Sequence, residues 1–221
     1  MIESGLDLEG RVEARRDDGA VVAVHAVGVT FGGEPALRPT SFSVGRGEAV
    51  VISGPSGSGK STLLRAIAGL VAPTTGEVVL WDGPRAVKDR RIGITLEEPR
   101  LWPWMRAVDN VVCAAGLHGV AISRSDAVEL LEHLALGDAT RVRASKLSQG
   151  MRRRVQLAGA LAVGKDLLLL DEPTASLDAE NGALVWSRLE QRRVEGRTLV
   201  VASHDDSWQG ELVADRVELR A

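Results

Sequence analysis

Short runs of β-branched residues, separated by glycine turns, mark the first quarter of the chain. The segments VVAVHAVGVTF, TSFSV and AVVIS follow one another between residues 21 and 53, and the turn GRGE joins the last two. Runs of this kind, joined by turns that contain glycine, predict strands. We therefore expect an N-terminal sheet that is partly antiparallel.

The hydrophobic spacing changes to a helical period after residue 60. Leu63, Leu64, Ile67 and Leu70 fall on one stripe of a helix over residues 60–70. Residues 76–81 and 91–96 are predicted strands, whereas helical segments such as SRSDAVELLEHLAL, broken by proline and glycine, dominate residues 98–150. The change in composition indicates an inserted α-helical subdomain.

Two fully apolar runs follow, LLLL at residues 167–170 and LVVA at residues 199–202, and helices are predicted over residues 151–163 and 183–194. Strands without alternation are typical of the buried centre of a parallel sheet. The pattern predicts an α/β fold with a mainly parallel sheet, an N-terminal antiparallel β subdomain and the helical insert. We expect residues 21–221 to form this domain and residues 1–20 to be a flexible tail.

Composition narrows the class of protein. The 221 residues are 44% hydrophobic and 26% charged, which is typical of a soluble globular protein, and the net charge of −3 argues against a nucleic-acid binder. Cys113 is the only cysteine, so no internal disulfide forms. The N-terminus lacks the pattern of a signal peptide and the apolar runs are too short to span a bilayer, so we expect a cytoplasmic protein.

The segment GPSGSGKST, residues 54–62, lies between a predicted strand and a predicted helix and matches G-x-x-x-x-G-K-[ST]. Glycines let successive amides point at one anion, and the helix N-terminus adds partial positive charge. Lys60 supplies a cation for the β- and γ-phosphates, and Ser61 a hard oxygen ligand for Mg²⁺. The expected phosphate-binding residues of this P-loop NTPase core are Gly54, Pro55, Ser56, Gly57, Ser58, Gly59, Lys60, Ser61 and Thr62.

Two carboxylates narrow the chemistry. In LLLLDEP, Asp171 and Glu172 stand at the C-terminal end of a buried strand, the edge at which open parallel sheets bind ligands. Asp171 can hold the Mg²⁺ shell, and Glu172 can polarise a water molecule for attack on the γ-phosphate. This pair favours nucleotide hydrolysis.

A third segment, SKLSQGMRRRVQLAGAL, places Ser148 directly before a predicted helix, where it fits an N-cap at a second anion-facing terminus. One nucleotide does not need two such sites in one chain. Taken together, GPSGSGKST, LSQGM, LLLLDEP, ASLD and the SHD at residues 203–205 resemble the ATP-binding subunit of ABC transporters. The motifs follow the family's order over residues 21–219.

The resemblance implies ATP and Mg²⁺ as cofactors and a head-to-tail dimer, homomeric or heteromeric, that encloses two ATP molecules. Phe31 matches the aromatic residue that stacks on adenine, although a strand-core role is equally open. The segment LSQGM is the family's signature, which contacts the γ-phosphate bound to the partner, and ASLD is the loop that crosses the interface. The further site residues implied are Ser148, Gln149, Gly150, Asp178 and the switch histidine His204.

Three positions depart from the family pattern. Glu97 stands where the family has a glutamine that reaches Mg²⁺ and the attacking water. A carboxylate still coordinates Mg²⁺ but adds negative charge near the γ-phosphate, so we expect ATP binding with altered turnover. Gln149 replaces a glycine, and Met151 replaces a glutamine, which removes one polar contact.

The segment PRLWPWMRAVDNV, residues 99–111, is rich in tryptophan and is either local core or a docking surface. The resemblance favours docking of membrane subunits near Leu101, Trp102, Trp104 and Met105. The run Arg152–Arg154 is expected to be the exposed face of the signature helix rather than a nucleic-acid contact.

The resulting hypothesis is an ATPase subunit that energises a membrane transporter from the cytoplasmic face of the cell membrane. The segment EPRLWPW is similar to the nitrate, sulfonate and taurine importer branch. The alternatives are a soluble ABC-type ATPase that acts on ribosomes or DNA, and a small-molecule kinase with the same phosphate loop.

Overall fold

The computed structural model describes residues 19–80, 92–164, 166–204 and 206–220. Of the tail predicted over residues 1–20, residues 1–18 lie outside the described residues, and Ala20 already belongs to the first strand. The strand ends at Trp81 and Arg91, and Asp205, also lie outside the described residues. Within the described ranges, no helix combines the length and apolar character needed to cross a membrane.

The N-terminal β-branched runs form an antiparallel sheet of three strands. β1 (Ala20–Phe31) pairs with β2 (Glu34–Gly45) on one side and with β4 (Thr75–Leu80) on the other. The hairpin between β1 and β2 turns at Gly32 and Gly33, both of which have positive φ. The predicted antiparallel subdomain is therefore confirmed.

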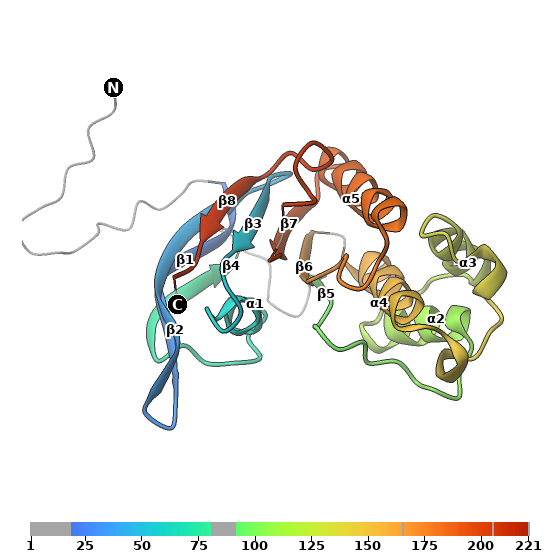
Figure 1. Cartoon of the computed structure of the whole chain (residues 1–221), viewed down its shortest axis with the longest axis horizontal. Coiled ribbons are helices and arrows are strands. Elements are labelled where there is room, and N and C mark those ends of the chain that lie inside the picture. The colour runs from blue at the N-terminus through green and yellow to red at the C-terminus, as the bar shows by residue number, and fades with distance from the viewer. Residues whose placement is uncertain (1–18, 81–91, 165, 205, 221) are drawn as a thin grey trace, which may run out of the picture.

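The second sheet is parallel and lies in the centre of the molecule (Figure 1). Its order is β5 (Ile92–Ile94), β6 (Leu167–Asp171), β7 (Thr198–Ala202), β3 (Ala49–Ser53) and β8 (Asp215–Glu218). Every residue of β3, β6 and β7 is buried, as expected for strands covered on both faces. The α/β fold class is thus confirmed, and β8 is a strand that the pattern did not predict.

Helix α1 (Lys60–Ile67) packs between the two sheets through Leu63, Leu64 and Ile67. The prediction that Leu70 continues this stripe is wrong, because the helix ends earlier and Leu70 is 61% exposed. Gly69 adopts φ 71°, a left-handed conformation that closes helices, and the Leu70 amide bonds back to the Arg65 carbonyl.

Residues between β5 and β6 supply a separate group of helices, seen on the right of Figure 1. These are α2 (Ala107–Leu117), α3 (Arg124–Glu132), the 3-10 turns Gly137–Ala139 and Ala144–Lys146, and α4 (Gln149–Val163). Helix α5 (Ala179–Val194) lies between β6 and β7 in the chain and begins four residues before its predicted start.

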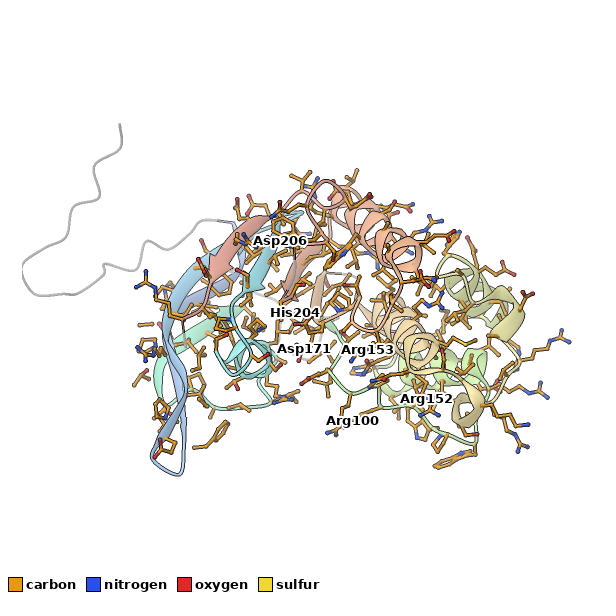
Figure 2. The ribbon with its side chains drawn as sticks, viewed as in Figure 1. Arg100, Arg152, Arg153, Asp171, His204 and Asp206 are labelled. Carbon is orange, nitrogen blue, oxygen red and sulfur yellow. The ribbon has the colours of Figure 1, made fainter. Side chains whose placement is uncertain are left out.

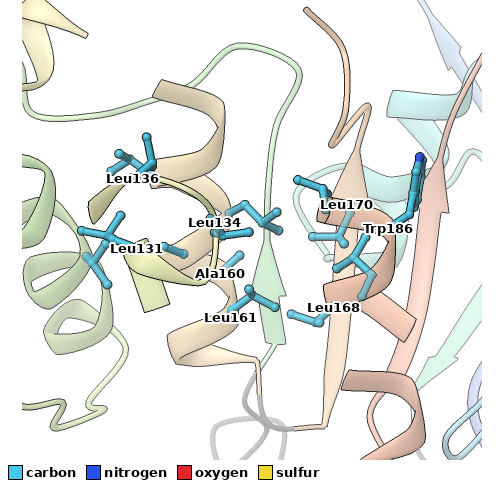
Figure 3. Packing of buried hydrophobic residues seen from close by; sticks show 14 of the residues in the cluster. Leu131, Leu134, Leu136, Ala160, Leu161, Leu168, Leu170 and Trp186 are labelled. Atoms are coloured by element: carbon cyan, nitrogen blue, oxygen red, sulfur yellow. The ribbon is translucent and has the colours of Figure 1, made fainter. Parts of the chain in front are cut away.

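One apolar cluster joins these helices to the parallel sheet (Figure 3). It runs from α3 and α4 to Leu168 and Leu170 of β6 and to Trp186 of α5, whose indole nitrogen donates to the Ser207 hydroxyl at 3.0 Å. Because interiors are closely packed, such a continuous core fixes the start of α4 relative to the edge of the sheet.

Candidate nucleotide site

The loop between β3 and α1 forms the floor of the site. Its last residue, Gly59, is the N-cap of α1 with φ 95°, and a Cβ there would lie 2.5 Å from the Ala36 carbonyl oxygen. Only glycine fits this backbone and this approach. No side chain among the described residues caps α1, so its first amides are available to an anion.

Lys60 folds back over this loop. Its ammonium donates to the carbonyl oxygens of Gly54 at 2.7 Å and Pro55 at 3.1 Å, and the side chain is buried. Ser58 also turns its hydroxyl inward, where it has no hydrogen-bond partner within the described part of the chain. The cation is therefore held at the mouth of the loop, in reach of a phosphate chain.

A cavity of about 430 Å³ opens above the loop. Phe31 lies at its rim with 55% of its surface exposed, so the strand-core interpretation of Phe31 is wrong. An aromatic ring in this position can cover a flat base. The residues that line the cavity are Phe31, Ala36, Ser56, Gly57, Gly59, Lys60, Ser61, Thr62, Glu97 and Glu172.

Asp171 ends β6 beside this cavity and is only 3% exposed. Burial raises the pKa of its carboxyl group; a hydrogen bond from Ser61 lowers it, and the neighbouring charges of Glu97 and Glu172 raise it further. Its Oδ1 atom has no hydrogen-bond partner among the described residues. A buried carboxylate with a free oxygen, next to a serine hydroxyl, fits a hard divalent cation.

The donor set is incomplete without a ligand. Within the described ranges, no three acidic, histidine or cysteine side chains lie close enough together to hold a metal ion by themselves. Mg²⁺ is commonly held by one or two protein oxygens together with substrate phosphates. Ser61 and Asp171 fit that arrangement.

Glu172 follows Asp171 in a left-handed conformation, with φ 46°. Its amide donates to the Ala202 carbonyl at 3.0 Å, which ties the residue to the end of β7. Its carboxylate oxygen Oε2 lies 2.7 Å from Nδ1 of His204. The structure thus brings together two residues that the sequence predicted separately, the carboxylate for the attacking water and the switch histidine, and Figure 2 labels His204 near Asp171 at the centre of the molecule.

The signature segment and the ASLD loop lie outside the cavity. Ser148 is the N-cap of α4, with its hydroxyl accepting from the Met151 amide at 3.2 Å, as predicted. Asp178 is the N-cap of α5, and its carboxylate accepts from the Asn181 amide at 2.8 Å. Ser148, Gln149, Gly150 and Asp178 are therefore not among the residues that line the nucleotide cavity.

The prediction that Arg152–Arg154 form an exposed face is wrong. Arg152 donates to the carbonyl oxygens of Ala144 and Ser145, and Arg153 to that of Glu172 at 3.3 Å. Arg154 is buried and donates to the Leu134 carbonyl and to Asn181 Oδ1. The physical reason is that the guanidinium groups pair with backbone carbonyls at the ends of neighbouring segments.

The tryptophan segment forms a fixed, partly exposed loop. Asn110 is buried and its amide group accepts from the Trp102 amide at 2.7 Å and donates to the Trp102 carbonyl at 3.2 Å. Trp104 is 67% exposed, so a pure core role does not hold for it, and Met105 is half-buried. Leu101 and Trp102 line a groove of about 250 Å³ between β5, α2 and α4.

Two residues at this site gave no clear signal in the sequence. The Thr95 hydroxyl accepts from the Asp171 amide at 3.1 Å and so fixes the end of β6. Arg153 reaches Glu172 from another element. Thr95 lies in GITLEEP, two residues before Glu97, but only the pairing of β5 with β6 brings it to Asp171.

A parallel sheet with a phosphate loop after β3 and two carboxylates at the end of β6, with β7 between these two strands, defines a P-loop NTPase. Residues 37–175 match the sequence model of the ABC transporter family, and the chain belongs to this family.

Known relatives include proteins of import and of export. The chain is 35% identical over 191 residues to the Nod factor export ATP-binding protein I of Bradyrhizobium diazoefficiens, covering 83% of this chain and 62% of that protein. It is 38% identical over 204 residues to the aliphatic sulfonates import ATP-binding protein SsuB 2 of Pseudomonas fluorescens, covering 91% and 74%. The chain spans between 56% and 62% of the length of the first three curated relatives that it matches.

Solved structures share the fold. One is an ATP-binding cassette in a dimeric post-hydrolysis state bound to ADP and Pi, with a TM-score of 0.72 and 31% identity over 83% of this chain and 88% of that chain. Another is a putative ABC transporter ATP-binding protein from Pyrococcus furiosus, with a TM-score of 0.78 and 25% identity over 90% and 96%.

Proposed function

We propose that this chain is the ATP-binding and ATP-hydrolysing subunit of an ABC transporter. The observation that carries the proposal is the 2.7 Å contact between Glu172 and His204 at a cavity floored by the phosphate loop. This contact supports a role for Glu172 as a general base, held by a second side chain, in attack on the γ-phosphate. The solved relative bound to ADP and Pi supports hydrolysis as the reaction.

In this proposal the phosphate loop and Lys60 bind the phosphates, and Phe31 stacks on the adenine ring. Ser61 and Asp171, joined by Glu97, would hold Mg²⁺, which would neutralise charge on the phosphate oxygens. Glu172 accepts a proton from the water that attacks the γ-phosphorus, and ADP leaves with the electron pair of the broken P–O bond. His204 orients the Glu172 carboxylate through the observed contact.

The proposed partners account for the predicted site residues that do not line the cavity. Ser148, Gln149, Gly150 and Asp178 lie outside it, so they would close over ATP bound to a second ATPase subunit. Membrane subunits would dock near Leu101, Trp102, Trp104 and Met105, which places the protein on the cytoplasmic face of the cell membrane. ATP-driven dimerisation would then move the membrane subunits. The transporter relatives favour this function over an ATPase of ribosomes or DNA.

Glu172→Gln tests the proposal. The amide cannot take a proton, so hydrolysis is expected to fall at least about a hundredfold, since general-base catalysis contributes roughly 10²–10⁴. ATP binding is expected to persist, and the variant is expected to form a stable dimer with ATP, measured by size exclusion with light scattering. Glu180→Gln, an exposed position on α5, is the matched control and is expected to hydrolyse ATP at the parental rate. Parental hydrolysis by Glu172→Gln would refute the proposal.

A further inference from the structure

Arg153 connects the helix that begins at the signature segment to the proposed catalytic carboxylate. It lies in the second turn of α4 and its Nη1 atom donates to the Glu172 carbonyl oxygen at 3.3 Å. In Figure 2 the Arg153 label lies beside that of Asp171, on the side of α4 that faces the parallel sheet. The contact is between elements and does not belong to the regular hydrogen bonding of either.

Glu172 needs such support because its backbone is strained. Its φ of 46° lies in the left-handed region, which costs free energy for any residue other than glycine and persists only when neighbours hold it. Two backbone hydrogen bonds hold it, from its own amide to Ala202 and from the Ala175 amide to its carbonyl at 3.2 Å. A third hydrogen bond to the Glu172 backbone comes from the Arg153 guanidinium, and it is the one of the three that a side chain donates.

Arg153 does not reach the nucleotide cavity itself. It lines a separate space of about 10 Å³, together with Thr95, Gln156, Leu157, Asp171, Glu172 and Pro173. That volume is about one water molecule, too small for a nucleotide. Its Nε atom is buried and has no partner among the described residues. Arg153 can therefore influence a reaction in the cavity only through the residues it touches.

We propose that Arg153 is a positioning residue for ATP hydrolysis, which holds the Glu172 peptide so that its carboxylate faces His204 and the attacking water. The inference rests on the proposed function of Glu172. It also makes α4 a direct link between the signature segment at its N-terminus and the base of the same chain.

The first test separates binding from chemistry. Arg153→Ala removes the donor and is expected to lower kcat about tenfold, the factor that corresponds to a hydrogen bond from a charged group. KM for ATP is expected to stay within about twofold, because Arg153 does not line the cavity. Arg153→Lys keeps the charge and a donor and is expected to recover most of kcat, since the observed contact needs only one donor.

Arg188→Ala is the matched control. Its guanidinium also donates to a backbone carbonyl at 3.3 Å, that of His133 at the end of α3, and Arg188 does not line the nucleotide cavity. It is expected to keep parental kcat even where its melting temperature falls as much as that of Arg153→Ala. Equal losses of kcat in both alanine variants, or no recovery with lysine, would show a general structural role and overturn the proposal.

A double variant distinguishes the positioning role of Arg153 from the catalytic role of Glu172. In the Glu172→Gln background, adding Arg153→Ala is expected to leave the residual single-turnover rate unchanged, because the group that Arg153 positions is already inactive. A further tenfold loss there would show that Arg153 acts by another route and would overturn the inference. Parental hydrolysis by Glu172→Gln alone would instead refute the proposed function.

Discussion

Glu97 adds a third carboxylate to a site that must hold a polyanion. It lines the same cavity as Lys60 and Glu172, and its charge contributes to the raised pKa of Asp171. A negative side chain beside bound phosphates opposes free ATP and favours the complex in which Mg²⁺ offsets the charge. The residue therefore affects which form of the nucleotide the site prefers.

Replacing Glu97 with glutamine removes that charge at nearly constant shape. We expect Glu97→Gln to bind ATP about threefold more tightly without Mg²⁺, the order of a screened interaction at an exposed site. With saturating Mg²⁺ the gain is expected to shrink, and the rate of hydrolysis to change. Fluorescent-nucleotide binding and steady-state hydrolysis over a Mg²⁺ titration measure both effects.

Glu98→Gln is the control for this prediction, because Glu98 is the exposed neighbour and does not line the cavity. It is expected to match the parent at every Mg²⁺ concentration. Identical binding and rates for Glu97→Gln and the parent would show that the carboxylate has no contact with the nucleotide.

Local motifs made some site residues predictable from the sequence, whereas tertiary packing decided the contacts of others. Lys60, Asp171 and Glu172 were predictable because local motifs fix both their chemistry and their place at the edge of the sheet. Arg153 and Arg154 were not, because a run of charges on a helix usually faces solvent. Only the packing of α4 against the end of β6 and against the residues that follow α3 supplies the carbonyl oxygens that these arginines bind.

At the scale of elements, the tryptophan loop is tied to the segment that precedes the signature. The Ala144 amide donates to the Met105 carbonyl at 2.8 Å, and the Ser145 amide to the Pro103 carbonyl at 3.0 Å. With Asn110 holding Trp102, the loop has little freedom of its own. A partner that displaces this loop would therefore displace the start of α4 as well.

Trp104→Ala tests whether this loop is a docking surface. Trp104 is largely exposed, so its loss is expected to leave the melting temperature and ATP binding unchanged. Recovery of membrane subunits with the tagged protein after gentle solubilisation is expected to fall roughly tenfold, the effect of losing a tryptophan at the centre of an interface. Val194→Ala, which is exposed on α5, is the control and is expected to co-purify normally. Equal recovery with both variants would contradict docking at Trp104.

Helix α5 is anchored by Glu190 and Arg193. The Glu190 carboxylate accepts from Arg193 at 2.6 Å and from the Val213 amide at 3.2 Å, and Arg193 donates to the Gly47 carbonyl. The hydrogen bond from Arg193 is the main cause that holds the pKa of Glu190 below its ordinary value of 4.5. The ionised form is therefore the one that stabilises the fold.

Glu190→Gln is expected to lower the free energy of unfolding by about 0.5–1 kcal/mol at neutral pH, the range for a partly exposed ion pair. Because the folded-state pKa is depressed, this stabilisation is present above the unfolded value and is lost as pH falls through the folded value. The difference from the parent should therefore shrink with acidification below about pH 4.5. Denaturant unfolding across this range measures it, and a difference that does not depend on pH would contradict the assignment.

The type of each helix or strand was easier to predict from the sequence than the residues at which it begins and ends. The buried leucine run of β6 and the helical period of α1 are strong local signals, but Gly69 ended α1 before Leu70. Strand β8 was missed because its short, mostly exposed sequence DRVE has no apolar alternation, and its pairing with β3 decides its structure.

At the scale of the whole molecule, the sequence indicated two kinds of sheet and a helical insert but not the order of the parallel strands. Fully apolar strands look alike in sequence, so nothing local states that β7 lies between β6 and β3. That order determines the site, because it brings the ends of β3, β6 and β7 to one edge. Lys60, Glu172 and His204 follow those three ends.

The phosphate loop and the signature segment lie apart within one chain, so we expect one chain alone not to complete a site for ATP hydrolysis. Lys60→Ala removes the cation of the phosphate loop, and Ser148→Arg places a bulky charge at the start of α4. Each variant alone is expected to be inactive in hydrolysis. In a mixed dimer, the intact phosphate loop of the Ser148 variant would meet the intact signature segment of the Lys60 variant. One of the two sites in that dimer would then be complete. Random pairing of equal amounts makes half of the dimers mixed, so about one quarter of the parental rate is expected.

ATPase assays of the separate and mixed variants measure this recovery. A mixture as inactive as its components would contradict shared sites, whereas activity in Ser148→Arg alone would show that one chain completes its own site.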